Sequence, residues 1–169
     1  SKNDLQFQNL PFVILFKIEI LKKMSQQPVL GTVHHFCICV SDYKKSIEFY
    51  DSFLPKLGYK MLRNCDKYTC WVNSSLGQFG IAQAREEYKD IKHTRYAVGY
   101  HHLAWNATSK EEVDKFYELL VEKNYKILDA PKDYNYAPVY YAVFWEDPDG
   151  FKLELCYVPF PYESENKQE

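Results

Sequence analysis

The chain repeats itself once, with its two halves offset by about 67 residues. A pair of adjacent histidines followed by a short apolar run occurs in both halves, and a Phe-Tyr pair follows each of them at the same offset. Self-similarity at a fixed spacing indicates two copies of one structural unit, which constrains the fold more than composition does. The matching segments are His34–Cys39 with His101–Asn106, Phe49–Tyr50 with Phe116–Tyr117, and Gly58–Leu62 with Asn124–Leu128.

The first copy is predicted to contain a strand, a helix and then three strands. Residues 33–40 are rich in β-branched and aromatic side chains, which is typical of a strand, and Ser41 follows as the expected N-cap of a helix. Apolar side chains then recur at three- and four-residue spacing, as on one face of a helix, and Gly58 is expected to end it. The apolar residues are Ile47, Tyr50, Phe53, Leu54 and Leu57, and the three strands are expected at 59–64, 67–73 and 78–84.

The second copy follows the same order. Ser109 and Glu112 have the S-x-x-E spacing of a capping box, in which each side chain bonds the backbone amide of the other residue at a helix start. Asp147–Gly150 has the composition of a turn between the last two strands. The apolar residues of this helix are Val113, Phe116, Tyr117 and Leu120, and the strands after it are expected at 125–129, 139–146 and 152–158.

The repeat predicts an α+β fold of two tandem βαβββ modules, which together make a single domain. Met24 offers an alternative start for the chain, in which case residues 1–23 would not be native. The expected parts are an N-terminal extension at 1–28, module 1 at 29–84, a junction at 85–98, module 2 at 99–158 and a charged tail at 159–169.

Charge and composition exclude several classes of function. Lys and Arg number 21 against 23 Asp and Glu, so the chain lacks the basic excess that nucleic-acid binding needs. The apolar run within Leu10–Leu21 falls short of the ~20 apolar residues that cross a bilayer, so no membrane partner is expected. The five cysteines, odd in number and without a C-x-x-C pair, favour a reduced, cytoplasmic protein.

Alternation along the predicted strands points three metal-ligand side chains in one direction. Successive strand residues face opposite sides, so apolar Ile38 and Trp105 are expected under the helices, with His35 and His102 on the open faces of the sheets. Glu154 on the last strand faces the open side by the same rule. Two imidazoles and one carboxylate can bind Fe(II), Mn(II) or Zn(II) and leave positions for substrate. Hydrogen-bonded structural histidines are the alternative.

These segments together resemble the vicinal oxygen chelate superfamily, the group of glyoxalase I, extradiol dioxygenases and bleomycin or fosfomycin resistance proteins. The resemblance covers about residues 30–158 and rests on the repeated strand histidine and on the ending Asp-Pro-Asp-Gly-x-x-x-Glu. It implies a half-open barrel around one divalent ion (Fe, Mn, Ni or Zn) held by His35, His102 and Glu154, and a small substrate with vicinal oxygens. The modules could close on each other within one chain or across a homodimer.

A second carboxylate is missing from the expected place in module 1. In the glyoxalase-type proteins that this chain resembles, the metal site has two histidines and two carboxylates, with one carboxylate from the last strand of each module. When the two repeats are aligned with Gly77 at the position of Gly150, Ile81 falls at the position of Glu154. Gln83 is then the nearest residue that could act as a metal ligand in its place. The site is therefore expected to hold three protein ligands rather than four.

The tyrosine typical of extradiol dioxygenases is also missing, because Phe144 occupies its position. Ring cleavage by that mechanism is therefore not expected. Tyr140 and Tyr141 lie nearby, and strand alternation requires one of them to face the cavity. Both are candidates for a displaced catalytic phenol.

Other side chains are candidates to hold substrate. Arg95 in the junction could bind a carboxylate, or it could belong to a solvated charged loop. Cys37 and Asn106 share the open faces with the histidines, and Cys37 is expected to be small apolar lining. Tyr136 and its neighbours would form either a wall for a flat substrate or packing at a sheet edge.

The predicted function is a small metal-dependent enzyme of the glyoxalase or dioxygenase type that uses Lewis-acid catalysis on a small substrate. The alternative is a non-catalytic module that binds or sequesters a small ligand, as bleomycin-resistance proteins do. Metal analysis of the purified protein separates these two hypotheses.

Overall fold

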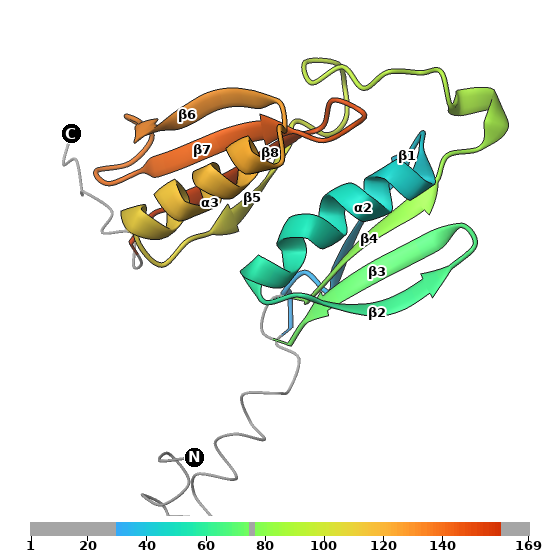
Figure 1. The fold of residues 1–169 in the computed structure, drawn as a ribbon, viewed down its shortest axis with the longest axis horizontal. Helices are drawn as coiled ribbons and strands as arrows, with labels where there is room; N and C mark the ends of the chain where they lie inside the picture. The colour runs from blue at the N-terminus through green and yellow to red at the C-terminus, as the bar shows by residue number, and fades with distance from the viewer. Residues whose placement is uncertain (1–29, 75–76, 160–169) are drawn as a thin grey trace, which may run out of the picture.

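The computed structural model describes residues 30–74 and 77–159, which form two four-stranded sheets, each with one helix against it (Figure 1). The strand order is β1-β4-β3-β2 in the first sheet and β5-β8-β7-β6 in the second. Each sheet pairs its first and last strands in parallel and its other strands antiparallel. Two tandem βαβββ modules in an α+β fold are therefore confirmed.

Module 1 has every predicted element, with strand ends shifted by one or two residues. Gly58 ends the helical segment in a left-handed conformation, as expected of a C-terminal glycine. The elements are β1 His35–Val40, α2 Tyr43–Phe53, the 3-10 helix η1 Leu54–Leu57, β2 Lys60–Cys65, β3 Tyr68–Asn73 and β4 Gly77–Gln83, followed in the junction by the 3-10 helix η2 Glu86–Tyr88.

Module 2 differs more from its prediction, because the first strand after its helix starts later than the expected residue 125. Asn124 adopts a positive φ of 55° just after the helix, and the chain becomes a strand only at Ile127. The elements are β5 His102–Asn106, α3 Lys110–Glu122, β6 Ile127–Asp133, β7 Tyr141–Glu146 and β8 Lys152–Tyr157.

The predicted N-cap of α2 was wrong by one residue. Asp42, with extended backbone, caps the helix, and its Oδ1 accepts a hydrogen bond from the Lys45 amide at 3.1 Å. Ser41 instead donates its amide and its hydroxyl to the carboxylate of Asp149 in the other module. The helix therefore starts one residue later than predicted, with Asp42 rather than Ser41 as its cap.

The predicted cap of α3 is Ser109, and this is confirmed, because its Oγ accepts a hydrogen bond from the Glu112 amide. The reciprocal half of the capping box goes elsewhere. Glu112 Oε2 accepts from both the amide and the hydroxyl of Thr108, at 2.8 and 2.6 Å, rather than from the Ser109 amide.

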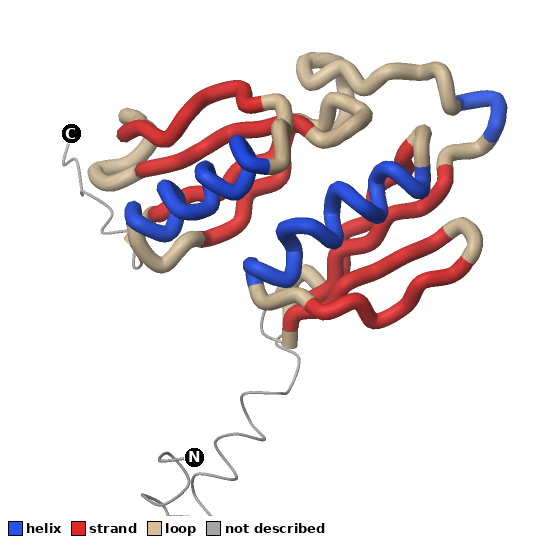
Figure 2. Tube along the Cα trace, in the orientation of Figure 1, coloured by secondary structure: helices blue, strands red, loops and turns tan. Residues whose placement is uncertain are grey.

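The helix-facing sides of both sheets share one hydrophobic core. Phe53 at the end of α2 is fully buried, and its ring centroid lies 5.8 Å from those of Trp105 and Phe116 and 5.6 Å from that of Trp145. All three partners belong to module 2. Each helix lies against one face of its own sheet (Figure 2), so the opposite faces of both sheets point away from this core.

The turn Asp147–Gly150 joins the two modules through hydrogen bonds. The Tyr50 hydroxyl of α2 donates to Asp147 Oδ2 at 2.7 Å, and the Ser41 amide donates to Asp149 Oδ2 at 2.9 Å. Asp147 is only 6% exposed, and its Oδ1 also accepts from the amides of Asp149 and Phe151. The predicted turn thus also connects module 2 to module 1.

The buried Asp147 carboxyl is expected to make stability depend on pH. Burial raises the pKa of Asp147 to about 6, against about 3.9 in an unfolded chain. Between these values the folded protein holds a proton that the unfolded chain has lost. The free energy of unfolding should therefore fall by about 2–3 kcal/mol as pH rises from 4 to 6, with little further change above. Urea unfolding at each pH measures this loss.

The matched variant Asp147→Asn cannot lose a proton at this position. The difference in free energy of unfolding between the unmodified protein and Asp147→Asn should therefore shift in favour of Asn as pH rises from 4 to 7. A difference that stays constant across this range would contradict the raised pKa.

Among the described residues, no helix is long and apolar enough to cross a membrane. The predicted extension at 1–28 and all but the first residue of the predicted tail lie outside the residues that the structure describes.

Candidate functional site

Strands β5 and β8 place His102 and Glu154 on the open face of the second sheet. The two strands pair in parallel, with His102 opposite Lys152 and Ala104 opposite Glu154. The residues that alternate with them, Leu103 and Trp105 on β5 and Leu153 and Leu155 on β8, face the helix and pack in the core. The face predicted for both side chains from strand alternation is therefore the face that they occupy.

The two side chains meet in a geometry that suits a shared metal ion. His102 Nε2 lies 3.3 Å from Glu154 Oε2, and Glu154 is 1% exposed while the His102 side chain is 37% exposed. Nitrogen and oxygen ligands each bind divalent ions at about 2.0–2.2 Å, so neighbouring donor atoms around one ion lie roughly 3 Å apart. Their spacing and their chemistry both fit a divalent ion.

The electrostatic surroundings favour the neutral imidazole that binds metals. Burial lowers the pKa of His102, and the nearby charges of Lys152, His101 and Arg95 lower it further. Burial raises the pKa of Glu154, while hydrogen bonding from Tyr140 and the charge of Lys152 oppose this shift. The site thus combines a neutral imidazole, a buried carboxyl and two neighbouring cations.

His35, the third predicted ligand, lies on the open face of the other sheet. It is exposed, and its Nδ1 lies 3.0 Å from Nδ1 of His34. Within residues 30–74 and 77–159, no three His, Cys, Asp or Glu side chains gather where they could hold a metal. One chain therefore brings together two of the three predicted ligands.

The predicted match of Ile81 to Glu154 was wrong by one residue. Cys37 and Ala104 occupy equivalent positions in the repeat, and they pair with Gly80 and Glu154 respectively. Gly80 is therefore the counterpart of Glu154, while Ile81 is fully buried in the core. The error arises because Gly77 already belongs to β4, whereas the turn glycine of module 2 precedes β8 by two residues.

Module 1 offers no carboxylate and no substitute at this place. A Cβ added to Gly80 would lie 2.9 Å from Tyr68 Oη, so the tyrosine occupies the space above the glycine. Gln83, the substitute considered from the sequence, donates its amide to the Ser41 carbonyl at 2.9 Å. The position in module 1 that corresponds to Glu154 therefore carries no side chain that could bind a metal.

Of the two candidate phenols, Tyr140 faces the site. Its hydroxyl donates to Glu154 Oε1 at 2.5 Å, while Tyr141 donates to Asp114 on α3, at the helix side of the sheet. Burial and the bond to Glu154 raise the pKa of Tyr140 far above its ordinary value, so the phenol stays a donor. Phe144, in the position of the missing tyrosine, pairs with Glu154 across the strands.

The remaining candidates are spread over several places. Arg95 is close enough to lower the pKa of both His102 and Lys152 through its charge. Cys37 lies on the open face of module 1, and burial raises the pKa of its thiol, as in an unreactive lining cysteine. Asn106 instead lines a hollow near the end of α2.

Four aromatic side chains form a panel beside Glu154. Tyr136, 69% exposed, packs its ring against Tyr134 and Tyr140, with centroids 5.2 Å away in both cases. Tyr134 in turn contacts Phe144. The aromatic panel (Tyr134, Tyr136, Tyr140 and Phe144) thus extends from the carboxylate to solvent.

Sequence reasoning did not single out Lys152. Its ammonium lies 3.7 Å from the centroid of the Phe144 ring and next to Glu154 on the same face. The signal was available, because Lys152 precedes Glu154 by two residues and so faces the same side of β8.

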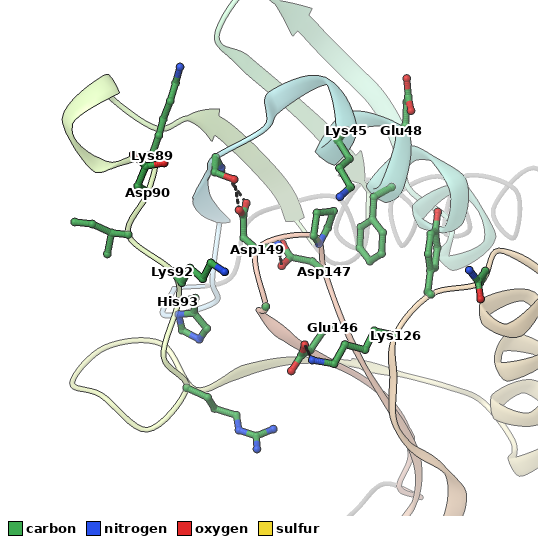
Figure 3. Close-up of a pocket in the computed structure, with 18 of the residues that line it drawn as sticks. Lys45, Glu48, Lys89, Asp90, Lys92, His93, Lys126, Glu146, Asp147 and Asp149 are labelled. Atoms are coloured by element: carbon green, nitrogen blue, oxygen red, sulfur yellow. Dashed lines mark hydrogen bonds and ion pairs between the residues drawn. The ribbon is translucent and has the colours of Figure 1, made fainter.

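A hollow in the described part of the chain is lined by neither His102 nor Glu154. It has a volume of about 920 Å³ between α2, the junction and the turn after β7 (Figure 3). Two of its carboxylates are paired, Asp149 with Ser41 of module 1 and Glu146 with Lys126 at 2.5 Å within module 2. Apart from Arg95, which also lines the hollow, we assign its residues no role in the site.

The second module of this duplicated βαβββ fold thus carries a histidine and a carboxylate together on an open sheet face. The sequence pattern of the Glyoxalase/Bleomycin resistance protein/Dioxygenase superfamily matches residues 32–155, and the chain belongs to this superfamily.

Individual relatives agree with this assignment. The uncharacterised protein YqjT of Bacillus subtilis is 36% identical over 124 residues, which are 73% of this chain and 96% of that protein. The metallothiol transferase FosB of Staphylococcus saprophyticus is 30% identical over 128 residues, 75% of this chain and 77% of FosB. A solved protein from Bacillus halodurans, provisionally assigned as a glyoxalase, is 29% identical with a TM-score of 0.70, covering 76% of this chain and 97% of its own.

Proposed function

We propose that the protein is a metal-dependent enzyme whose site combines His102 and Glu154 of one chain with His35 of a second copy. The observation that carries the proposal is the 3.3 Å approach of His102 Nε2 to Glu154 Oε2 on a sheet face turned away from the core. Two histidines and one carboxylate leave coordination positions open for a substrate.

A second copy supplies the third ligand most simply. The open face of module 1 carries the exposed His35, and the open face of module 2 carries the other two ligands. In a two-fold dimer, each contact between two different residues occurs twice. Module 1 of each chain, placed over module 2 of the other, would therefore complete two identical sites.

The charge around the site favours a substrate with an acidic group. Lys152 and Arg95 lie close enough for their charges to lower the pKa of His102. The acidic groups that raise the pKa of Lys152, Glu154 and Asp129, act less strongly than Arg95 does. We therefore expect Lys152 and Arg95 to hold a carboxylate or phosphate group of the substrate.

The relative FosB is named a metallothiol transferase, and this name supports a thiol as the second substrate. A bound divalent ion supplies Lewis-acid chemistry at the substrate oxygens. The chain's own residues would orient the acidic group through Lys152 and Arg95, and the aromatic panel would hold the apolar part of the substrate.

A binding module without catalysis is the second candidate, and the aromatic panel favours it. Tyr136 offers an exposed ring for stacking, as in proteins that hold flat ligands without changing them. The two candidates differ in whether the site needs a metal.

Metal titration of the tag-free protein tests the proposal. We expect Mn(II), Zn(II), Ni(II) or Fe(II) to bind at about one ion per chain, and the Glu154→Gln variant to lose this binding, because an amide is a much weaker ligand than a carboxylate. Elemental analysis and isothermal titration give the stoichiometry.

The matched control is Glu146→Gln, which removes a carboxylate on the same sheet that is paired with Lys126. It should bind metal like the unmodified protein. Uptake below about a tenth of an ion per chain by the unmodified protein, with every metal, would contradict the enzyme proposal and favour the binding module.

A further inference from the structure

The two oxygens of Glu154 face different partners. Oε2 lies 3.3 Å from His102 Nε2, whereas Oε1 accepts the hydroxyl of Tyr140 at 2.5 Å. Glu154 is 1% exposed, so water cannot readily replace the phenol as a partner of Oε1. One oxygen is thus directed at the metal-ligand side, and the other is already engaged.

Tyr140 reaches Glu154 along the sheet rather than from directly across. Phe144 is the residue that pairs with Glu154, and Ala142 pairs with Cys156 on the next position of the same face. Tyr140 precedes Ala142 by two residues. Ala142 is therefore the diagonal neighbour of Glu154, and Tyr140 lies one position further along the same face. The long side chain of Tyr140 reaches back over the small, fully buried Ala142 to Glu154.

Neighbouring rings restrain the phenol in this position. The Tyr140 ring centroid lies 5.2 Å from that of Tyr136 and 6.4 Å from that of Tyr134, both nearly perpendicular to it. Tyr134 also packs against Phe144. The ring is therefore held between neighbours on the same face, and its hydroxyl has a fixed direction.

We propose that Tyr140 is a positioning residue that keeps Glu154 a one-oxygen ligand, so that an additional coordination position of the ion stays open for substrate. This inference rests on the proposed function. It assigns to Tyr140 no contact with the reacting atoms. It deepens the proposal by explaining how a site with only three protein ligands keeps its carboxylate from closing on the ion with both oxygens.

The variant Tyr140→Phe tests this role with Mn(II) as the probe. The phenylalanine keeps the ring contacts and removes only the hydroxyl. We expect the Kd for Mn(II) to rise about tenfold or more, as is typical when a partner of a metal ligand is lost. We also expect water-proton relaxation to show one fewer exchangeable water on the ion, because the freed Oε1 takes its place.

Tyr141→Phe is the matched control. It removes the hydroxyl of the next tyrosine along the chain, which donates to Asp114 on the helix side of the sheet, away from Glu154. It should leave both the Kd and the number of bound waters unchanged. Circular dichroism confirms that both variants are folded.

Failure of the inference and failure of the proposed function give different results. If the unmodified protein binds Mn(II) and Tyr140→Phe has the same Kd and the same number of bound waters, the role of Tyr140 is overturned while the enzyme proposal stands. If the unmodified protein binds none of Mn(II), Zn(II), Ni(II) and Fe(II), both are overturned.

Discussion

Mixing the His35→Ala and His102→Ala variants should restore metal binding to about a quarter of the unmodified level, although neither variant should bind metal alone. In a site shared between two chains, His35 comes from one chain and His102 from the other. A mixed dimer then contains one site that lacks both histidines and one that is intact. Random exchange makes about half of the dimers mixed, which gives the expected quarter.

A second mixture is the control. His102 and Glu154 come from the same chain in each site, 3.3 Å apart. A mixture of His102→Ala and Glu154→Gln should therefore bind no metal, because every site in the mixed dimer lacks one of them. A mixture of His35→Ala and Glu154→Gln should recover like the first.

Isothermal titration after unfolding and refolding the mixed chains together measures the recovery. Light scattering should show a dimer for each variant. No recovery in either mixture containing His35→Ala would contradict a site shared between chains.

Replacing Phe53 with alanine should cost about 3–5 kcal/mol of the free energy of unfolding, as is typical when a buried phenylalanine leaves a cavity. Phe53 is fully buried, and its ring contacts reach Trp105, Phe116 and Trp145 across the boundary between the modules. Because a domain of this size is stable by only about 5–15 kcal/mol, the loss is a large part of the whole.

Urea unfolding followed by tryptophan fluorescence measures this loss, since Trp105 and Trp145 lie beside the ring. Val121→Ala on α3 is the control, because that valine is 53% exposed and should cost less than about 0.5 kcal/mol. A loss below about 1 kcal/mol for Phe53→Ala would contradict a core shared by the two modules.

The repeat and the alternation of strand residues made most of the fold and half of the site predictable. Apolar residues at helical spacing in both copies, such as Phe53 and Phe116, are buried in one core. His102 and Glu154 meet because β5 and β8 pair side by side, and alternation puts both on the same face. Local periodicity is sufficient here, because one sheet contains both residues.

Features that depend on contacts between distant residues could not be read in this way. Ser41 is a residue type typical of an N-cap, but its amide donates a hydrogen bond to Asp149, which is far away in the sequence. The counterpart of Glu154 was misplaced because a turn glycine does not hold the same position relative to the strand in both modules. Alternation correctly predicts that His35 lies on an open face of its sheet. What that face contacts depends on packing between modules, which no local sequence pattern records.

The contact between Gly80 and Tyr68 limits how a fourth metal ligand could be engineered into module 1. A glutamate at position 80 would restore the symmetry of the repeat, yet its Cβ would lie 2.9 Å from Tyr68 Oη. A glutamate introduced alone would have to displace the Tyr68 ring, and removal of the tyrosine alone supplies no ligand. The two positions are therefore expected to be epistatic, and a library built to evolve a fourth ligand has to vary both at once.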